Sequence, residues 1–151
     1  MTVCPVSVII PAHNCESCLS LALDSALAQE PRPAQIIVVN DGSTDGTADA
    51  ARNYGGGIVL LEQENRGQGA ARNAGLAVAA GEYVAFLDSD DYWKPGFLAS
   101  CVRFLERHPE ACAVGTMLIM RNADGTERIL PQSLDPRLLT SGPFVIDRFF
   151  D

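Results

Sequence analysis

The chain reads Tyr83-Val84-Ala85-Phe86-Leu87-Asp88-Ser89-Asp90-Asp91, an apolar run that ends abruptly in three carboxylates. A short apolar run of this kind is typical of a strand buried within a sheet. In open α/β sheets, ligands bind beyond the carboxyl ends of the strands. Mg²⁺ and Mn²⁺ prefer oxygen ligands, usually one or two carboxylates together with phosphate oxygens of a substrate. The stretch therefore predicts either a metal-diphosphate site or a solvated acidic turn before a helix.

Strand and helix patterns alternate on both sides of this stretch. The apolar runs that predict strands cover residues 6–10, 35–39, 58–61, 82–87 and 112–120, with a hairpin turn at 122–125 leading to 128–130. Helical spacing predicts one helix after an N-cap at Asn14, one capped by Ser43 or Thr44, one over 67–80 and one beginning at Pro95. This alternation predicts an α/β fold with a mainly parallel sheet and helices on both faces.

Length and composition restrict the class of protein. A chain of 151 residues that is 47% hydrophobic and 20% charged can bury a proper core. The formal net charge of -8 argues against a broad basic face for nucleic acid. No apolar run approaches the roughly 20 residues that span a bilayer, and the N-terminus does not resemble a signal peptide. We expect a cytoplasmic protein without a transmembrane segment, peripheral at most to the inner face of a membrane.

The cysteines offer a second pattern. Cys15 and Cys18 have the spacing of a redox motif, and the same spacing could supply half of a zinc site. No second pair follows, and the odd total of five cysteines favours reduced thiols. His13 and His108 are not spaced as partner ligands. The interpretation that the sequence favours is thiols packed against helices.

Three loops follow the carboxyl ends of predicted strands, at residues 11–14, 40–43 and 88–91. Parallel strands bring such loops to one edge of a sheet. Asp41 can accept hydrogen bonds from a base or a ribose, so a nucleotide could extend from Asp41 to Asp90. Alone, Asp41 would be interpreted as part of an ordinary turn into a helix. Its coincidence with the acidic cluster favours a ligand site.

Four ordered motifs resemble those of the family 2 glycosyltransferases, which have a GT-A fold. They are Val8-Ile9-Ile10-Pro11-Ala12-His13-Asn14, Val38-Val39-Asn40-Asp41-Gly42-Ser43-Thr44-Asp45, Asn65-Arg66-Gly67-Gln68-Gly69-Ala70-Ala71-Arg72-Asn73-Ala74-Gly75 and Gly81-Glu82-Tyr83-Val84-Ala85-Phe86-Leu87-Asp88-Ser89-Asp90-Asp91. Order and spacing both match, from about Val6 to Met120. The resemblance implies a Rossmann-like GT-A domain for nucleotide-sugar binding over residues 1–130. Residues 131–151 would be a loop and the start of an incomplete acceptor-side region.

Such enzymes transfer a sugar from a nucleotide-diphosphate donor, often UDP-linked, with inversion at the anomeric carbon. The resemblance implies this activity here, with Mn²⁺ or Mg²⁺ as cofactor and a carbohydrate or lipid-linked acceptor. It implies a nucleotide-sugar site made by Pro11, Ala12, His13, Asp41, Arg66, Asp88 and Ser89. It implies a metal site made by Asp90 and Asp88, the DxD motif. The sequence does not determine the oligomeric state, and a homo-oligomer is one of the possible states.

Several of these residues have a plainer interpretation beside the functional one. Arg66 offers a planar donor fork to a phosphate or carbonyl, and otherwise forms a surface ion pair with Glu62 or Glu64. His13 stacks on the base or belongs to a turn. Arg72 lies within a predicted helix and is interpreted as structural.

The sequence departs from the family pattern at Asn40, where a second acid is common, and in its downstream half. Inversion needs a general base, which in the family follows the DxD motif. The downstream carboxylates lack the expected context, so no base is assigned among Asp124, Glu127, Asp135, Asp147 and Asp151. Two hypotheses remain, an inverting metal-dependent glycosyltransferase and a nucleotide-sugar binding module without acceptor chemistry. A dinucleotide-binding oxidoreductase is weaker, because no glycine loop follows the first strand.

Overall fold

The computed structural model describes residues 3–116, 118–122 and 125–130 of the chain. It divides into two compact units, Met1–Val102 and Arg103–Asp151. The main elements of the first unit are β1 (Val3–Ala12), α1 (Leu19–Leu27), β2 (Arg32–Asp41), α2 (Thr47–Arg52), β3 (Val59–Gln63), α3 (Gln68–Val78) and β4 (Tyr83–Phe86). The short 3₁₀ helix η1 (Gly55–Gly57) precedes β3, and α4 (Phe97–Arg107) follows β4. The second unit contains the strands β5 (Leu118–Arg121) and β6 (Glu127–Leu130).

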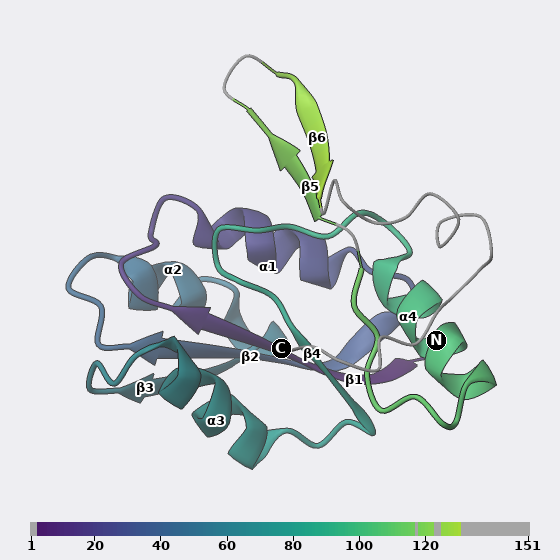
Figure 1. Ribbon diagram of the computed structural model, residues 1–151. Helices are drawn as coiled ribbons and strands as arrows, with labels where there is room; N and C mark the ends of the chain where they lie inside the picture. The colour runs from purple at the N-terminus through teal and green to yellow at the C-terminus, as the bar shows by residue number, and fades with distance from the viewer. Residues whose placement is uncertain (1–2, 117, 123–124, 131–151) are drawn as a thin grey trace, which may run out of the picture. The chain divides into compact units, whose positions relative to one another are not determined.

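The sheet of the first unit has the strand order β3-β2-β1-β4, and every neighbouring pair is parallel. Val8 of β1 lies opposite Ile36 of β2 on one side and Ala85 of β4 on the other. Helices α1 and α2 cover one face of this sheet, and α3 covers the other (Figure 1). The predicted α/β fold with a parallel sheet between helices is confirmed. The carboxyl ends of β1, β2 and β4 consequently meet at one edge.

Successive side chains of β1 point to opposite faces of the sheet and enter two cores. Val8 and Ile10 pack in the core that contains Leu23 of α1. Ile9, between them in sequence, packs in the core that contains Ala71 of α3. All five residues are completely buried. A strand buried on both faces is therefore apolar without interruption, which explains the continuous pattern in the sequence.

Helix α3 lies unusually close to β1, and a glycine makes the approach feasible. A Cβ atom added to Gly75 would lie 2.5 Å from Cγ2 of Ile9. At Gly69, on the same helix, an added Cβ would meet nothing within 4 Å. The absence of a side chain at Gly75 therefore sets the spacing between α3 and the sheet.

Two predicted helix starts are wrong. Helix α1 begins at Leu19 after an N-cap at Cys18, because Asn14 has a positive φ of 48° and turns the chain instead. Helix α2 begins at Thr47 after Gly46, because Ser43 and Thr44 form hydrogen bonds with Asn14 and do not cap the helix. Both helices therefore start later than their capping residues indicated.

In the second unit, β5 and β6 form an antiparallel pair with Met120 opposite Arg128, as the predicted hairpin requires. The strand predicted over 112–120 begins only at Leu118. Gly115 interrupts the apolar run, and glycine weakens a strand interior. The proposed division at residue 130 stays a prediction, and the loop and the start of an acceptor-side region predicted over 131–151 lie outside the described residues.

Candidate functional site

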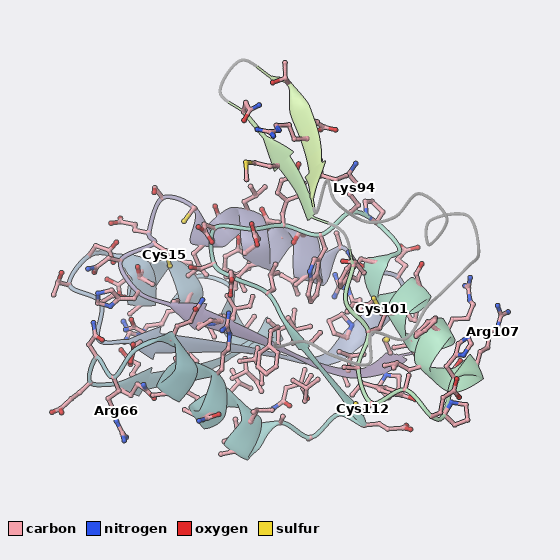
Figure 2. The ribbon with its side chains drawn as sticks, in the orientation of Figure 1. Cys15, Arg66, Lys94, Cys101, Arg107 and Cys112 are labelled. Atoms are coloured by element: carbon pink, nitrogen blue, oxygen red, sulfur yellow. The ribbon has the colours of Figure 1, made fainter. Side chains whose placement is uncertain are left out.

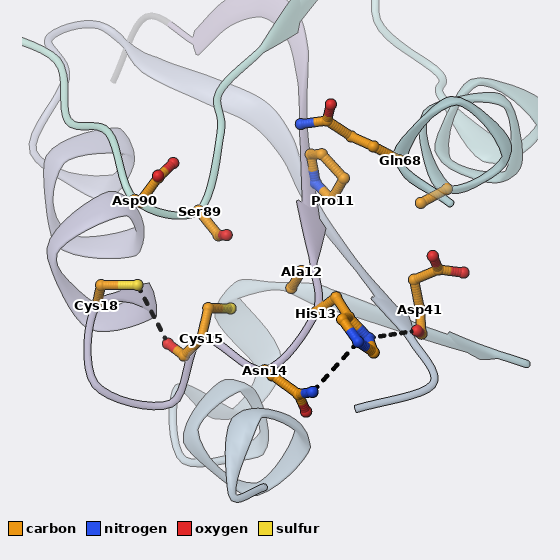
Figure 3. A pocket seen from close by; sticks show the side chains of 11 residues that line it. Pro11, Ala12, His13, Asn14, Cys15, Cys18, Asp41, Gln68, Ser89 and Asp90 are labelled. Atoms are coloured by element: carbon orange, nitrogen blue, oxygen red, sulfur yellow. Dashed lines mark hydrogen bonds between the residues drawn. The ribbon is translucent and has the colours of Figure 1, made fainter. Parts of the chain in front are cut away.

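A pocket of about 350 Å³ opens within the first unit, at the carboxyl ends of β1, β2 and β4 (Figure 3). Its walls combine the end of β1 and the following turn, the end of β2, the start of α3 and the loop after β4. The lining residues are Pro11, Ala12, His13, Asn14, Cys15, Cys18, Asp41, Gln68, Ala71, Ser89 and Asp90. The structure thus brings together six of the residues that the resemblance named. Arg66 and Asp88 lie outside the lining.

Asp41 is 3% exposed and is held by three hydrogen bonds from the segment that leads into α3. Its Oδ1 accepts from the Gln63 side chain at 2.7 Å and from the Arg66 backbone at 2.9 Å. Its Oδ2 accepts from the backbone of Gly67 at 2.8 Å. Burial raises the pKa of Asp41, but these hydrogen bonds outweigh it and hold the pKa below its usual value. Asp41 is therefore an ionised residue in the wall of the pocket, and it also fixes the position of the segment that leads into α3.

Arg66 takes part in this anchor through its backbone N–H, while its side chain is exposed and points outward (Figure 2). The alternative interpretation, a surface ion pair of Arg66 with Glu62 or Glu64, is wrong: neither pair forms, and Glu62 pairs with Arg52 at 2.7 Å. The structure therefore gives Arg66 a positioning contact and leaves its guanidinium away from the pocket.

His13 lies at the rim of the pocket, where backbone and amide groups fix its ring. Its Nδ1 is 2.8 Å from the carbonyl oxygen of Asp41, to which it can only donate. Its Nε2 is then the acceptor in the neutral imidazole and lies 3.2 Å from the amide nitrogens of Asn14 and Asn65. These contacts favour one tautomer and hold the ring between the ends of β1 and β2.

Asp88 is engaged by two side chains of α3. Its Oδ1 accepts a hydrogen bond from Gln68 at 3.0 Å and from Arg72 at 2.7 Å. Arg72, interpreted from the sequence as structural, thus pairs with the acidic cluster, and its guanidinium also lies 5.8 Å from the centre of the Phe86 ring. Gln68 and Arg72 are four residues apart and share a helix face. The four-residue spacing of Gln68 and Arg72, on a helix that precedes the strand ending before Asp88, was the sequence signal that could have identified them as its partners.

Asp90 differs from Asp88 in having no partner among the residues that the structure describes. It is exposed in the pocket, and its carboxylate makes no hydrogen bond or ion pair within the described part of the chain. Burial, with the charges of Asp90 and Asp88, raises the pKa of Asp91. Among residues 3–116, 118–122 and 125–130, no cluster of three or more His, Cys, Asp or Glu side chains could hold a metal ion. A cation at Asp90 would need ligands from a bound molecule.

The segment after the acidic cluster is held by two polar side chains of the α1 region, the buried Gln29 and the half-buried Ser25. Gln29 is 1% exposed; its side chain donates to the Lys94 carbonyl at 3.1 Å and accepts from the Leu98 backbone at 3.2 Å. Ser25 accepts a hydrogen bond from the backbone of Trp93 at 3.1 Å. The sequence carried no signal for this clamp, because its partners are more than 60 residues apart along the chain.

Residues 7–143 match the model of glycosyl transferase family 2. The chain belongs to this family. A glycosyltransferase of Nostoc sp. (strain PCC 7120) is 40% identical over 132 residues, which cover 85% of this chain and 40% of that protein. Within the described residues, no helix combines the length and apolarity that a membrane crossing demands.

Two solved structures of glycosyltransferases are similar to the chain. S. aureus TarS in complex with UDP-GlcNAc is 33% identical with a TM-score of 0.61, and the match covers 69% of this chain and 32% of TarS. The mannosyltransferase PcManGT of Pyrobaculum calidifontis, in complex with GDP-Man and Mn²⁺, is 32% identical with a TM-score of 0.59. That match covers 67% of this chain and 32% of PcManGT. The family 2 chain thus spans less than half the length of these relatives.

Proposed function

We propose that this family 2 chain binds a nucleotide-diphosphate sugar, with a UDP-sugar as the expected donor, in the pocket at the ends of β1, β2 and β4. The observation that carries the proposal is the carboxylate of Asp90, which has no partner in the described part of the chain and lines the same pocket as Asp41. The complexes of TarS with UDP-GlcNAc and of PcManGT with GDP-Man and Mn²⁺ support this class of ligand. The donor would extend from the His13 and Asp41 side toward Asp90.

The two ends of the pocket suit different parts of such a donor. At one end, the fixed imidazole of His13 and the apolar surfaces of Pro11 and Ala12 offer a wall for the nucleoside. At the other, Ser89 and Asp90 present oxygen ligands, and no Lys or Arg lies among the lining residues. A diphosphate would be repelled by Asp90 unless a cation lay between them.

The donor set at this end fits Mn²⁺ or Mg²⁺. These ions take one or two carboxylates and complete their shell with substrate phosphate oxygens and water. Asp90 would be the principal protein ligand, and Asp88, whose Oδ1 is held by Gln68 and Arg72, keeps Oδ2 for a further contact. When bound, the cation would act as a Lewis acid for the charge on the departing nucleotide diphosphate.

An inverting transfer also needs a general base that takes the proton of the acceptor hydroxyl. We expect this hydroxyl to belong to a carbohydrate or lipid-linked acceptor. Of the downstream carboxylates, Asp124, Asp135, Asp147 and Asp151 lie outside the described residues, and Glu127 lies on β6 in the second unit. The proposed function therefore assigns donor binding to the first unit and assigns no catalytic base.

Calorimetric titration of UDP, GDP and UDP-sugars, with Mn²⁺ and with EDTA, tests the proposal. We expect Mn²⁺-dependent binding of UDP that Asp90→Asn abolishes, because that variant keeps the size of the side chain and removes its charge. Asp49→Asn, at an exposed carboxylate on α2, is the matched control. Unchanged metal dependence in Asp90→Asn would contradict the site. Donor turnover measured on the same preparation separates a transferase from the alternative, a nucleotide-sugar binding module.

A further inference from the structure

Cys15 and Cys18 lie at the two ends of a tight turn that leads into α1. The backbone N–H of Cys18 donates to the carbonyl oxygen of Cys15 at 3.0 Å, and that of Leu19 donates to the same oxygen at 2.9 Å. A turn closed in this way brings its end Cα atoms within about 7 Å. Disulfides join Cα atoms that are roughly 4.4–6.8 Å apart. The backbone therefore already holds the two cysteines near the separation that a disulfide needs.

Both thiols face the same pocket as Asp90 (Figure 3). Cys18 is half-buried, and its Sγ lies 3.5 Å from the carbonyl oxygen of Cys15. Burial raises the pKa of Cys18, and the neighbouring Cys15 thiol adds to this effect. Cys15 is 6% exposed, and its Sγ lies 3.9 Å from the hydroxyl of Thr47. Both cysteines are free thiols, so a pair of neighbouring sulfurs forms part of the pocket wall.

We propose that Cys15 and Cys18 form a dithiol modification site in the wall of the donor pocket. Low-molecular-weight disulfides of the glutathione class oxidise it to an intramolecular disulfide, and this oxidation weakens nucleotide binding. The modification follows from the geometry of the two cysteines alone. The effect of this modification on nucleotide binding rests on the proposed function.

The reaction is a thiol–disulfide exchange in two steps. The more accessible Cys18 loses its proton and attacks one sulfur of the glutathione disulfide, which breaks that S–S bond and forms a mixed disulfide on Cys18. The first glutathione leaves as a thiolate and takes up a proton. Cys15 then loses its proton and attacks the Cys18 sulfur, and the second glutathione leaves as a thiol. In total, two cysteine thiols give up two electrons and two protons, and one glutathione disulfide becomes two thiols.

The backbone from Cys15 to Asn14 and the contact of Asn14 with His13 connect the dithiol to the nucleoside end of the pocket. Forming the S–S bond draws the Cys15 sulfur toward Cys18 and away from Thr47, whose hydroxyl also accepts a hydrogen bond from the Cys15 backbone at 2.8 Å. The next residue back is Asn14, whose side chain lies 3.2 Å from Nε2 of His13. A change in the turn thus displaces pocket-lining groups. Coupling between sites is reciprocal at equilibrium, so bound nucleotide must also make the oxidation less favourable.

The test exposes the full reduced chain to glutathione buffers of increasing oxidised fraction. Remaining thiols are then alkylated, and peptide mass analysis locates a loss of two hydrogens in the segment that contains Cys15 and Cys18. We expect this loss in the wild type and in Cys112→Ser, whose exposed thiol lies outside the pocket. We expect none in Cys18→Ser, which leaves the buried Cys15 in place. Dithiothreitol should restore the reduced mass.

Nucleotide binding is measured on the same samples. We expect UDP with Mn²⁺ to shift the oxidation to a higher oxidised fraction of glutathione. We also expect the oxidised chain to bind UDP more weakly than the reduced chain, with recovery after dithiothreitol. A stable glutathione adduct on Cys18, or no oxidation across the series, would overturn the proposal. Equal UDP affinity of both forms would also overturn it. If the reduced chain bound no nucleotide at all, the proposed function would fail, and the disulfide would be judged by mass alone.

Discussion

Arg72 of α3 donates a hydrogen bond to the carboxylate of Asp88 across 2.7 Å, and this pair joins the helix to the loop that contains Asp90. We expect Arg72→Gln to bind UDP with Mn²⁺ about three- to tenfold more weakly. The reason is that Asp88 would lose its cationic partner, and the loop that contains Asp90 would no longer be held in its orientation. Both side chains are more than one-third exposed, so stability should fall by less than about 1 kcal/mol. Calorimetric titration and urea unfolding provide the two measurements.

Arg66→Gln is the matched control for this substitution. The Arg66 side chain is exposed, and its backbone contact with Asp41 survives the change. Equal losses of affinity in the two variants would show that a general change of charge, and not the pairing with Asp88, governs binding.

The anchored carboxylate of Asp41 predicts a pH-dependent stability. Its pKa in the folded chain lies below the unfolded value of about 3.9, because the hydrogen bonds it accepts outweigh the effect of burial. The stabilisation is therefore complete above that unfolded pKa and is lost as the pH falls through the folded pKa. Asp41→Asn should cost about 1–3 kcal/mol at neutral pH, since an amide nitrogen would face a backbone donor. Urea unfolding between pH 7 and pH 3 measures the difference from the wild type.

That difference should begin to narrow below about pH 4, where the Asp41 carboxyl of the unfolded chain becomes protonated, and should keep narrowing as the pH falls through the lower pKa of the folded chain. Asp49→Asn changes an exposed carboxylate on α2 and serves as the control. A difference between Asp41→Asn and the wild type that stayed constant down to pH 3 would show that ionisation of Asp41 contributes nothing to stability.

The clamp made by Gln29 predicts a large effect from one buried amide. Gln29→Leu removes the partners of the Lys94 carbonyl and the Leu98 backbone N–H, so we expect a loss of about 1–3 kcal/mol. The segment that the clamp holds contains the single tryptophan, Trp93, whose ring stacks on Phe97 at 4.7 Å between centroids. Urea unfolding followed by tryptophan fluorescence therefore reports both stability and the local environment.

Ser20→Ala, at an exposed position of α1, controls for a change of helix composition. The prediction requires a red-shifted native emission in Gln29→Leu only. A Gln29→Leu variant with wild-type emission and a stability within about 0.5 kcal/mol of the wild type would show that the clamp does not hold the segment.

The strands and their order along the chain were predictable, because a strand buried on both faces must be apolar throughout, as Ile9 and Ile37 illustrate. The loops of the site were predictable for a related reason, since parallel strands deliver their carboxyl ends to one edge. Helix starts were not, because Asn14 can cap a helix or adopt a positive φ, and tertiary contacts decide between them.

The positioning contacts of the site were equally hidden. The donors to Asp41 are contributed by a segment more than 20 residues away, and two of them are backbone N–H groups, which every residue type except proline offers. The pairing of Arg72 with Asp88 depends on how far α3 lies from β4. A sequence pattern fixes which face a helix presents, but that distance depends on packing.

The packing of α3 on β1 predicts opposite effects for two identical substitutions on one helix. Gly69→Ala should raise the free energy of unfolding by up to about 1 kcal/mol, because alanine is the better helix former and open space surrounds that position. Gly75→Ala should lower it by about 1–3 kcal/mol, because the new methyl group would lie 2.5 Å from Cγ2 of the fully buried Ile9. Urea unfolding of both variants measures the contrast. If Gly75→Ala were as stabilising as Gly69→Ala, helix propensity alone would govern α3, and its close contact with Ile9 would not set the spacing between helix and sheet.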